Sequence, residues 1–306
     1  MFIPISSEMK KSASSKGKVL KYLFLLNPIA GVGERRDLLQ MIAVACREKE
    51  VDHKILFTRS PGDAKKIIRK RFDKFDVFVA VGGDGTMNEV ASALAGTTGT
   101  MGLIPAGSGN ALGRELGLSM KPEEAIKQLL NGHVMQIDTG LVNGRRFMNV
   151  CGLGFDNHIA RVFAKATSRG PIPYFKATVK EFFSYRPETY EVETNGIKAN
   201  YTAFVLTVAN TAQYGNNAFI APKANLTDGI LDFCALKPFG FFGALGLGFR
   251  LFNKTIDRSP HCIYFKTKTV VIRGRNLNFH VDGEPVKNND PVEISIDPLS
   301  LNVVVP

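Results

Sequence analysis

The first half of the chain alternates strand-like apolar segments with segments of amphipathic spacing. The strand-like segments occupy residues 21–28, 51–58 and 75–83. Between them, residues 33–50 and 61–72 place apolar side chains at the i, i+3 and i+4 positions of a helix that covers a core. Strands with continuous apolar residues are typical of a parallel sheet that is buried on both faces. The β-α-β-α-β order therefore predicts an α/β domain with a parallel sheet.

The second half has a different pattern. From about residue 134 the apolar stretches are mostly strand-like and are separated by turn dipeptides such as Asn143-Gly144, Asn195-Gly196 and Asp228-Gly229. This pattern predicts a mainly antiparallel β-sandwich domain. Two amphipathic segments, residues 155–166 and 173–185, are expected to form helices within it.

These patterns define the expected domain organisation. The boundary falls between Gly132 and Gln136, which gives an α/β domain over residues 21–134 and a β-rich domain over residues 135–291. The last segment, residues 292–306, is expected to return to the first domain. Residues 1–20 form a polar, lysine-bearing lead without the long apolar region of a signal peptide, and we expect this lead to be disordered.

Composition limits the possible partners and the compartment. The 306 residues carry a net charge of +11, which favours anionic partners such as nucleotide phosphates, nucleic acid or an acidic membrane surface. No recognised nucleic-acid module is present, so nucleic acid is not an expected partner. Four dispersed cysteines without a C-x-x-C pair argue against a zinc ribbon or a disulfide framework and fit a reducing cytosol. The sequence contains no uninterrupted run of about 18 apolar residues, so no membrane-spanning helix is expected.

A glycine-rich stretch, AVGGDGTMNEV, follows the third predicted strand. Glycines at positions 82, 83 and 85 allow backbone N–H groups to approach phosphate oxygens, and Thr86 and Asn88 add polar side chains. The next helix would direct its positive end at an anion. Asp84 fits this site if Mg²⁺ or ordered water lies between its carboxylate and the phosphates. A simple tight turn is the alternative, since neither common nucleotide-binding glycine fingerprint is present.

A second glycine-rich loop strengthens the phosphate hypothesis. Residues 101–116 again run from a short strand through Gly107, Ser108, Gly109 and Asn110 into a helical pattern. Two such loops leaving strands of one sheet are expected to face each other across a triphosphate. Residues 27–36 form a third strand-to-helix turn of this kind.

Two acidic turns in the second half are candidates for catalysis and metal binding. In HVDGEP, Asp282 and Glu284 flank a glycine, so both carboxylates can lie near one spot, although an ordinary hairpin turn has the same letters. The segment PKANLTDGILDF reads first as a turn into a strand. The five histidines show no ligand spacing and are expected to have solvent or core roles.

The motifs NPIAG, GGDGTMNEV, IPAGSGNALGREL, NVCGLGFD, APKANLTDGILD and FHVDGEP occur in this order. Together they resemble the diacylglycerol kinase catalytic family, which includes bacterial lipid kinases and the sphingosine and ceramide kinases. The resemblance covers nearly the whole chain after Lys21. NAD kinases share the GGDGT loop, so this motif alone does not separate the two families. The resemblance rests on all six motifs in this order. The family's second loop usually reads G-T-x-N-D, whereas this chain has Ala111 after Asn110.

The resemblance implies an ATP-dependent transfer of the γ-phosphoryl group to a lipid hydroxyl, with Mg²⁺ as cofactor. It implies that Glu284 is the general base, with Asp282 as its partner and Asp84 as a third catalytic residue. Asp156 would bind the polar head of the acceptor. A structural Mg²⁺ would be held by the Asp228 side chain and the backbone carbonyls of Asn225 and Ile230. The implied nucleotide-binding residues are Asn27, Thr58, Gly82, Gly83, Asp84, Gly85, Thr86, Met87, Asn88 and Ser108.

The segment from Leu236 to Lys254 is rich in Phe and Leu and has basic edges. Core packing would explain such a segment, and so would shallow contact with an anionic bilayer. We expect a cytoplasmic, peripherally membrane-associated lipid kinase, with a homo-oligomer possible. An NAD kinase and a non-catalytic nucleotide-sensing protein on the same scaffold are the alternatives, and the identity of the acceptor lipid is open.

Overall fold

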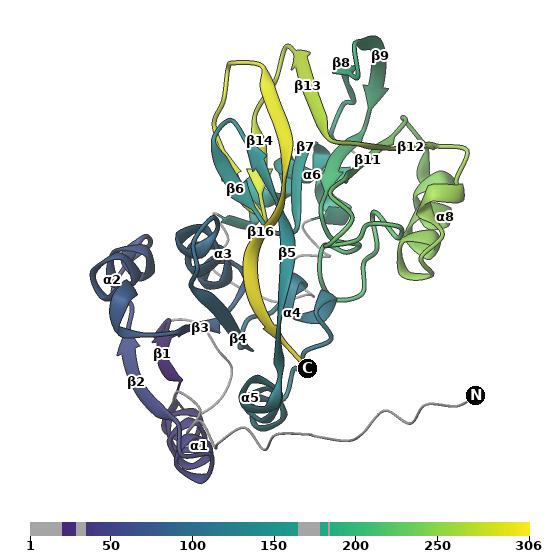
Figure 1. Cartoon of the computed structure of the whole chain (residues 1–306). Helices are drawn as coiled ribbons and strands as arrows, with labels where there is room; N and C mark the ends of the chain where they lie inside the picture. The colour runs from purple at the N-terminus through teal and green to yellow at the C-terminus, as the bar shows by residue number, and fades with distance from the viewer. Residues whose placement is uncertain (1–19, 29–34, 165–177, 183) are drawn as a thin grey trace, which may run out of the picture.

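The architecture was analysed on a computed structural model, which describes residues 20–28, 35–164, 178–182 and 184–306. Helices and strands alternate through the first part as the hydrophobic pattern predicts (Figure 1). The elements are β1 (Lys21–Leu26), α1 (Arg35–Glu48), β2 (Asp52–Phe57), α2 (Asp63–Arg71), β3 (Val77–Gly82), α3 (Asp84–Leu94), β4 (Thr100–Pro105), α4 (Ala111–Glu115) and α5 (Pro122–Asn131).

Strands β1 to β4 form a parallel sheet in the order β2-β1-β3-β4. Alternate residues of each strand point to opposite faces, so β1 contributes Leu23 and Leu25 to one core and Phe24 to the other. Helices α2 and α3 cover the first of these faces, and α1 and α5 cover the second. The predicted parallel sheet with two covered faces is confirmed.

The second part is built mainly of antiparallel strands. Its elements are β5 (His133–Val142), β6 (Arg145–Phe147), β7 (Val150–Gly154), α6 (Phe155–Ala164), β8 (Glu188–Thr194), β9 (Ile197–Ala203), β10 (Val205–Ala209), β11 (Leu231–Leu236), α8 (Phe241–Phe252), β12 (Cys262–Thr267), β13 (Thr269–Gly274), β14 (Phe279–Val281), β15 (Glu284–Val286) and β16 (Val292–Val305). Residues 178–182 are helical, and the rest of the helix expected over residues 173–185 lies largely outside the described residues.

Two sheets pack face to face in this part. One has the strand order β12-β11-β10-β7-β14-β15, and the other contains β16, β13, β8 and β9. Their inner faces share one hydrophobic core, to which Phe233 and Phe279 contribute from the first sheet and Tyr190 and Ile272 from the second. This arrangement confirms the predicted β-sandwich.

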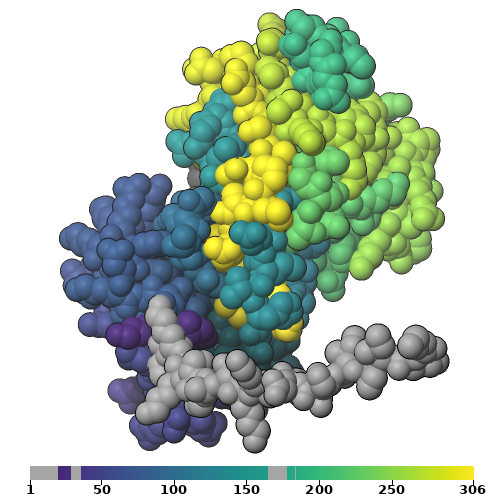
Figure 2. Space-filling view, viewed as in Figure 1, coloured from purple at the N-terminus to yellow at the C-terminus, as the bar shows by residue number. Residues whose placement is uncertain are grey.

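The final strand, β16, joins the two parts. It pairs with β13 in an antiparallel manner near Val292, and with β4 in a parallel manner through Asn302 and Val303. In Figure 2 the yellow strand runs from the upper lobe down into the lower one. One sheet contains strands of both parts, so the strand pairing does not mark a boundary between them. The domain limits at residues 134 and 291 stay predictions.

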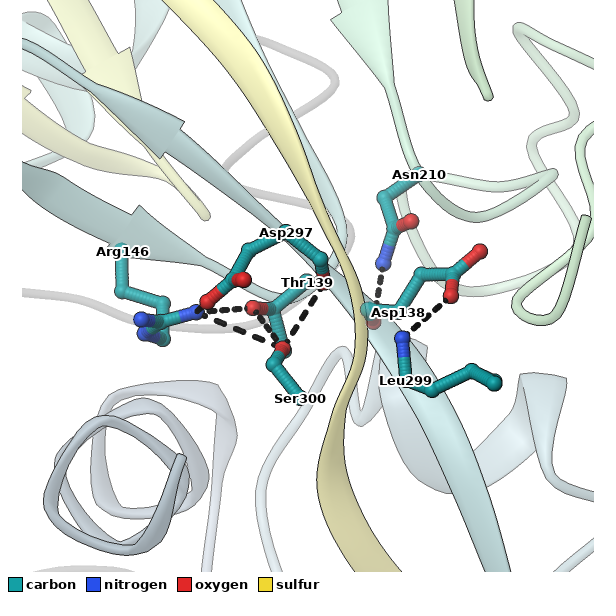
Figure 3. Close-up of polar contacts among 7 residues, drawn as sticks. All are labelled: Asp138, Thr139, Arg146, Asn210, Asp297, Leu299 and Ser300. Atoms are coloured by element: carbon teal, nitrogen blue, oxygen red, sulfur yellow. Dashed lines mark hydrogen bonds and ion pairs between the residues drawn. The ribbon is translucent and has the colours of Figure 1, made fainter. Parts of the chain in front are cut away.

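The pairing of β16 with β5 is interrupted by a bulge between Asp297 and Leu301. Figure 3 shows the polar contacts that stabilise it. The buried Asp138 carboxylate accepts a 2.7 Å hydrogen bond from the Leu299 backbone N–H. It also accepts one at 2.7 Å from the Gly229 N–H, which the figure does not draw. On the other side, Arg146 forms an ion pair with Asp297 at 2.7 Å. The bulge, and with it the path of β16 between the two parts, therefore has a defined conformation.

Within the described residues, no helix is both long and apolar enough to cross a membrane.

Candidate active site

The GGDGT stretch lies at the carboxyl edge of the parallel sheet. Strand β3 ends at Gly82, and α3 begins at Asp84. The first N–H groups of an α-helix have no partner inside the helix, and the helix dipole makes this end positive. Gly82 must be glycine because a Cβ there would lie 2.7 Å from the Thr86 hydroxyl oxygen. The loop therefore presents backbone donors at the edge where open α/β sheets bind ligands.

The second glycine loop contacts the first directly. A Cβ on Gly107 would lie 2.4 Å from the Gly83 Cα, so the two backbones touch at this point. No phosphate fits between these two glycines, so a phosphate could approach the joined loops only from their outer rim. The triphosphate-bridged arrangement expected from the sequence is thus replaced, at this position, by backbone contact.

Asp84 joins the two loops. Its carboxylate accepts hydrogen bonds from the N–H groups of Asn110 at 2.9 Å and Ala111 at 2.7 Å. Burial raises the pKa of Asp84, while these backbone hydrogen bonds act in the opposite direction. Both carboxylate oxygens are therefore engaged by the protein, and Asp84 caps the short helix α4.

Asn110 has a positioning role that the sequence did not single out. Its backbone is left-handed, with φ of 52°, a conformation that asparagine tolerates well. Its side chain accepts a hydrogen bond from the Gly107 N–H and donates one to the Gly107 carbonyl, at 2.9 and 2.8 Å. The spacing Gly-x-x-Asn at the start of a helix is the sequence signal for this closed loop.

The DGE motif is the turn of the β14–β15 hairpin. Asp282 and Gly283 both have positive φ, 48° and 87°, which is the type I′ geometry of tight hairpins. The Asp282 carboxylate accepts hydrogen bonds from the N–H groups of Met148, Asn149 and Val150 at 2.8 to 3.0 Å. Asp282 thus fixes the turn onto the start of β7.

A further contact fixes the DGE turn to the first part of the chain. The Asn88 side chain on α3 donates a 2.8 Å hydrogen bond to Asp282 Oδ2 and a 3.2 Å hydrogen bond to the Arg146 carbonyl. Asn88 therefore serves as a connection between the GGDGT helix and the DGE turn.

Glu284 consequently lies against the GGDGT loop. A Cβ placed on Gly85 would stand 3.0 Å from Glu284 Oε1, so glycine at 85 leaves space for the carboxylate. The pKa of Glu284 is raised mainly by partial burial of its carboxyl group and, to a smaller extent, by the negative charges of Asp282 and Glu89. The residue as a whole remains exposed to solvent. A carboxylate of raised pKa beside a glycine-rich loop of backbone donors is suited to accepting a proton.

Asp156 lies behind the DGE turn, at the start of α6. Its Oδ2 is 2.9 Å from the Nε2 of buried His280, in an ion-pair contact that is not aligned as a linear hydrogen bond. The Nδ1 of His280 accepts a hydrogen bond from the Gly283 N–H at 3.1 Å. Burial would lower the pKa of His280, but the nearby negative charges of Asp156 and Asp282 raise it overall. The structure thus connects Asp156 to the turn that carries Glu284.

The remaining sequence-predicted nucleotide residues occupy different surroundings. The Asn27 side chain donates to the Thr86 hydroxyl at 3.2 Å, and the Thr58 backbone N–H donates to the Leu26 carbonyl at 2.9 Å. Ser108 is exposed on the rim of the second loop. Met87 is 1% exposed and packs in the core beneath the sheet, so its side chain does not reach the rim.

The loop expected to hold a metal is neutralised by the protein itself. Asp228 Oδ2 lies 2.7 Å from the Lys266 ammonium nitrogen, and its Oδ1 accepts a hydrogen bond from the Ile230 N–H at 3.2 Å. The Asn225 side chain accepts from the Thr227 N–H and hydroxyl. The described residues hold no cluster of three or more metal-ligating side chains. In this arrangement the Lys266 ammonium group already lies against the Asp228 carboxylate, and the assignment of Mg²⁺ to Asp228 and to the carbonyls of Asn225 and Ile230 stays a prediction.

Comparisons with known proteins agree with this geometry. Residues 21–142 match the model of the diacylglycerol kinase catalytic domain, and residues 149–305 match that of the YegS C-terminal NAD kinase beta sandwich-like domain. A diacylglycerol kinase of Bacillus subtilis (strain 168) is 30% identical over 236 residues, which are 74% of this chain and 77% of that protein. The chain belongs to the diacylglycerol kinase family.

Other members of the diacylglycerol kinase family match over greater length. A diacylglycerol kinase of Mycobacterium tuberculosis (strain ATCC 25618 / H37Rv) is 28% identical over 298 residues, which are 94% of this chain and 95% of that protein. A crystal structure of a diacylglycerol kinase from Bacillus anthracis str. Sterne has a TM-score of 0.75 at 23% identity, covering 95% of this chain and 98% of that chain, and shows the same fold. Membership of this family makes the chain a phosphotransferase, for which ATP is the implied phosphoryl donor.

Proposed function

We propose that this protein transfers the γ-phosphoryl group of ATP to the hydroxyl of a lipid alcohol such as diacylglycerol, with Glu284 as the general base. The observation that carries the proposal is the approach of Glu284 Oε1 to Gly85 in the GGDGT loop. This approach joins a proton acceptor of raised pKa to a loop of backbone donors suited to phosphate.

The nucleotide is assigned to the rim of the two joined loops. The N–H groups at the start of α3 and the exposed Ser108 supply donors, and Asn27 orients Thr86 beneath them. Mg²⁺ is expected to arrive with ATP as the metal–nucleotide substrate and to neutralise phosphate charge. Asp84 acts in this proposal as the residue that holds the two loops together.

In the proposed reaction, the acceptor hydroxyl is placed between Glu284 and the γ-phosphate. The Glu284 carboxylate takes the hydroxyl proton, the hydroxyl oxygen bonds to the γ-phosphorus, and the bond from that phosphorus to the β-γ bridging oxygen breaks. The products are the phosphorylated lipid, ADP and the proton on Glu284. Asp282 keeps its four hydrogen bonds throughout and holds Glu284 in position.

Asp156 is assigned to the acceptor side of the site. It lies at the start of α6, behind the turn that carries Glu284, and is paired with His280. We place the polar head of the lipid near this helix start, with aromatic residues of the same region toward the acyl chains. A water-insoluble acceptor requires access to a bilayer, so the proposal includes peripheral contact with an anionic membrane.

The test is incubation of the purified protein with radiolabelled ATP, Mg²⁺ and separate acceptors: diacylglycerol, phosphatidylglycerol, a sphingoid base and NAD. The expected result is label in one or more lipid products and none in NAD. Label in NAD alone would establish the NAD kinase alternative. Saturable ATP binding without label in any acceptor would favour a nucleotide-sensing protein.

A further inference from the structure

Helix α8 carries apolar side chains on a face that the described part of the protein leaves uncovered. Leu247 is buried against the sandwich, and Leu251 packs beside it. The opposite face exposes 85% of Phe242, 59% of Leu245, 71% of Phe249 and 60% of Phe252. A helix that is apolar all round is normally buried on all sides, so the exposed face of α8 requires an explanation.

These four residues form one stripe, here called the α8 stripe, and Phe241, which is 54% exposed, lies next to it at the start of the helix. Their positions, 242, 245, 249 and 252, follow the 3-4-3 spacing that places side chains on one side of a helix. Gly246 and Gly248 have open space around them, so no neighbouring element crowds the helix there. Helix α8 lies at the margin of the β-rich part, on the right in Figures 1 and 2, away from α1 and α2.

The charged side chains of α8 and its flanking residues are positive, with Lys254 lining a pocket that also contains Glu115. Lys237, Arg250 and Lys254 flank or belong to the helix, and residues 237–256 contain no Asp or Glu. Lys237 and Lys254 are exposed. Apolar side chains on one face of a helix with basic residues at its edges are characteristic of helices that lie in the plane of an anionic membrane surface.

A second copy of the chain fits the stripe less well. Four side chains of this size expose on the order of 500 Å², below the roughly 800 Å² per partner of a stable interface. Two copies joined through α8 would also bring Arg250 and Lys254 near identical positive groups, with no acidic residue in the segment to offset them. A bilayer that contains acidic lipids offers both an apolar interior and the opposite charge.

Aromatic contacts connect α8 to the site. Phe239, just before the helix, packs against Phe204 with ring centroids 4.9 Å apart, and Phe204 packs against Phe155 at 4.6 Å. Phe155 is the neighbour of Asp156 in α6. A continuous series of packed aromatic side chains, here called the aromatic path, therefore connects the start of α8 to the residue assigned to the acceptor's polar head.

We infer that the α8 stripe inserts into the surface of an anionic bilayer and brings the aromatic path to the membrane from which the acceptor lipid enters. The inference rests on the proposed lipid-kinase function for its biological meaning, but the insertion itself can be measured without catalysis. It assigns the docking role to α8 in particular, whereas the chain's general positive charge would give only diffuse, salt-sensitive attraction.

The absence of tryptophan from the chain provides a direct probe. Phe249→Trp places a single tryptophan in the α8 stripe, and Ile197→Trp places one at a matched exposed position, 69% accessible, on β9. On addition of phosphatidylcholine–phosphatidylglycerol vesicles, Phe249→Trp should shift its fluorescence to the blue and be quenched by brominated acyl chains. Ile197→Trp should do neither. Equal responses of the two variants would overturn the inference.

Flotation of the full-length double variant Phe242→Ser/Phe249→Ser provides the second measurement. Loss of two inserted phenylalanines should weaken partition into these vesicles by roughly tenfold or more, while Ile197→Ser partitions as the unchanged protein does. If Phe249→Trp is already blue-shifted without vesicles, and Phe249→Ser converts a dimer to a monomer in light scattering, the stripe covers a second copy and the inference is wrong.

Activity separates the inference from the proposed function. The double serine variant should lose vesicle-dependent phosphorylation but keep turnover of a short-chain, water-dispersed acceptor, because Glu284 and the two loops are untouched. Wild-type turnover on vesicles by this variant would refute docking through α8 and leave the kinase function standing. If the Phe249→Trp variant inserts its tryptophan but the protein phosphorylates no lipid, the function is refuted and the docking surface stands.

Discussion

The Asn88 side chain donates a 2.8 Å hydrogen bond to Asp282 Oδ2. The two residues are 194 positions apart in the sequence, one in the first turns of α3 and the other in the β14–β15 hairpin. This contact places the DGE turn next to the GGDGT loop and brings Glu284 to Gly85. The site is therefore assembled by a bond between two residues that do not take part in the proposed proton transfer.

Replacement of the base should abolish chemistry without unfolding the protein. Glu284→Gln keeps the shape of the side chain but removes the proton acceptor, so kcat should fall by about 10²- to 10⁴-fold. The melting temperature should not fall and should rise slightly if it changes, because the Gln side chain removes a charge that Asp282 and Glu89 repel. Glu293→Gln, at an exposed position on β16, is the matched control. Near-normal kcat in Glu284→Gln would show that another group takes the proton.

Asp282 should behave as a positioning residue. Asp282→Asn must turn an NH₂ group toward backbone or side-chain donors that now bond to the carboxylate, so the free energy of unfolding should fall by about 2–3 kcal/mol. Urea denaturation measures this change, with Asp290→Asn as the exposed control. A variant that lost activity at full stability would contradict the structural role and indicate direct participation in catalysis.

Asp84 should affect the nucleotide more than the acceptor. Asp84→Asn loses at least one of the hydrogen bonds from the Asn110 and Ala111 N–H groups and loosens the joined loops. We expect KM for ATP to rise about tenfold, which corresponds to roughly 1.4 kcal/mol, with KM for the lipid little changed. Asp37→Asn, on the exposed side of α1, controls for the charge change. A selective rise in the lipid KM would contradict this assignment.

The pH dependence of kcat/KM should report the environment of Glu284. The base works only when deprotonated, and its pKa is raised, so activity should fall as the pH drops through a value above the ordinary 4.5. Glu89→Gln removes one of the negative charges that raise this pKa and should move the acid limb to lower pH. It can still accept the 2.7 Å hydrogen bond from the Gly62 N–H. Glu123→Gln, at an exposed position on α5, is the control and should leave the pH profile of kcat/KM unchanged.

Lys266 should make the Asp228 loop independent of divalent metal. Chelation with EDTA or addition of Mg²⁺ in the absence of nucleotide should change the melting temperature of the unaltered protein little, since the lysine already neutralises Asp228. Lys266→Met removes this charge, and Mg²⁺ should then raise the melting temperature of the variant. Strong stabilisation of the unaltered protein by Mg²⁺, lost in Asp228→Asn, would show that the metal displaces the lysine.

Much of the fold could be predicted from local patterns. The continuous apolar strands and the amphipathic segments between them follow from backbone periodicity, which is a property of neighbouring residues. The turn dipeptides Asn143-Gly144 and Asn195-Gly196 likewise indicate hairpins, and both asparagines adopt positive φ, whereas at Asp228-Gly229 only the glycine does. The helix at residues 155–164 was expected from its amphipathic spacing, whereas residues 236–254 stood out only as an apolar stretch, and no helix was predicted where α8 lies.

The sequence motifs also indicated which residues are candidates for the site, but they did not predict the contacts that these residues make. Asp84 and Asp282 stand in motifs that suggest acid chemistry, yet both use their carboxylates to accept backbone hydrogen bonds. His280 gave no signal of its pairing with Asp156 because the two are on separate elements. Lys266 was equally unremarked beside Asp228, since only strand pairing between β11 and β12 brings the ammonium group there.

Local sequence was sufficient to predict the α/β class of the first part, the β-rich class of the second part, the glycine loops and the acidic hairpin. Each of these features depends on the conformational preferences of a few adjacent residues. Tertiary packing was needed to establish that β16 runs through both parts, that the two glycine loops touch, and that Glu284 meets Gly85 while the α8 stripe is left uncovered. These features depend on contacts between distant segments, and the periodicity of either segment alone carries no information about its partner.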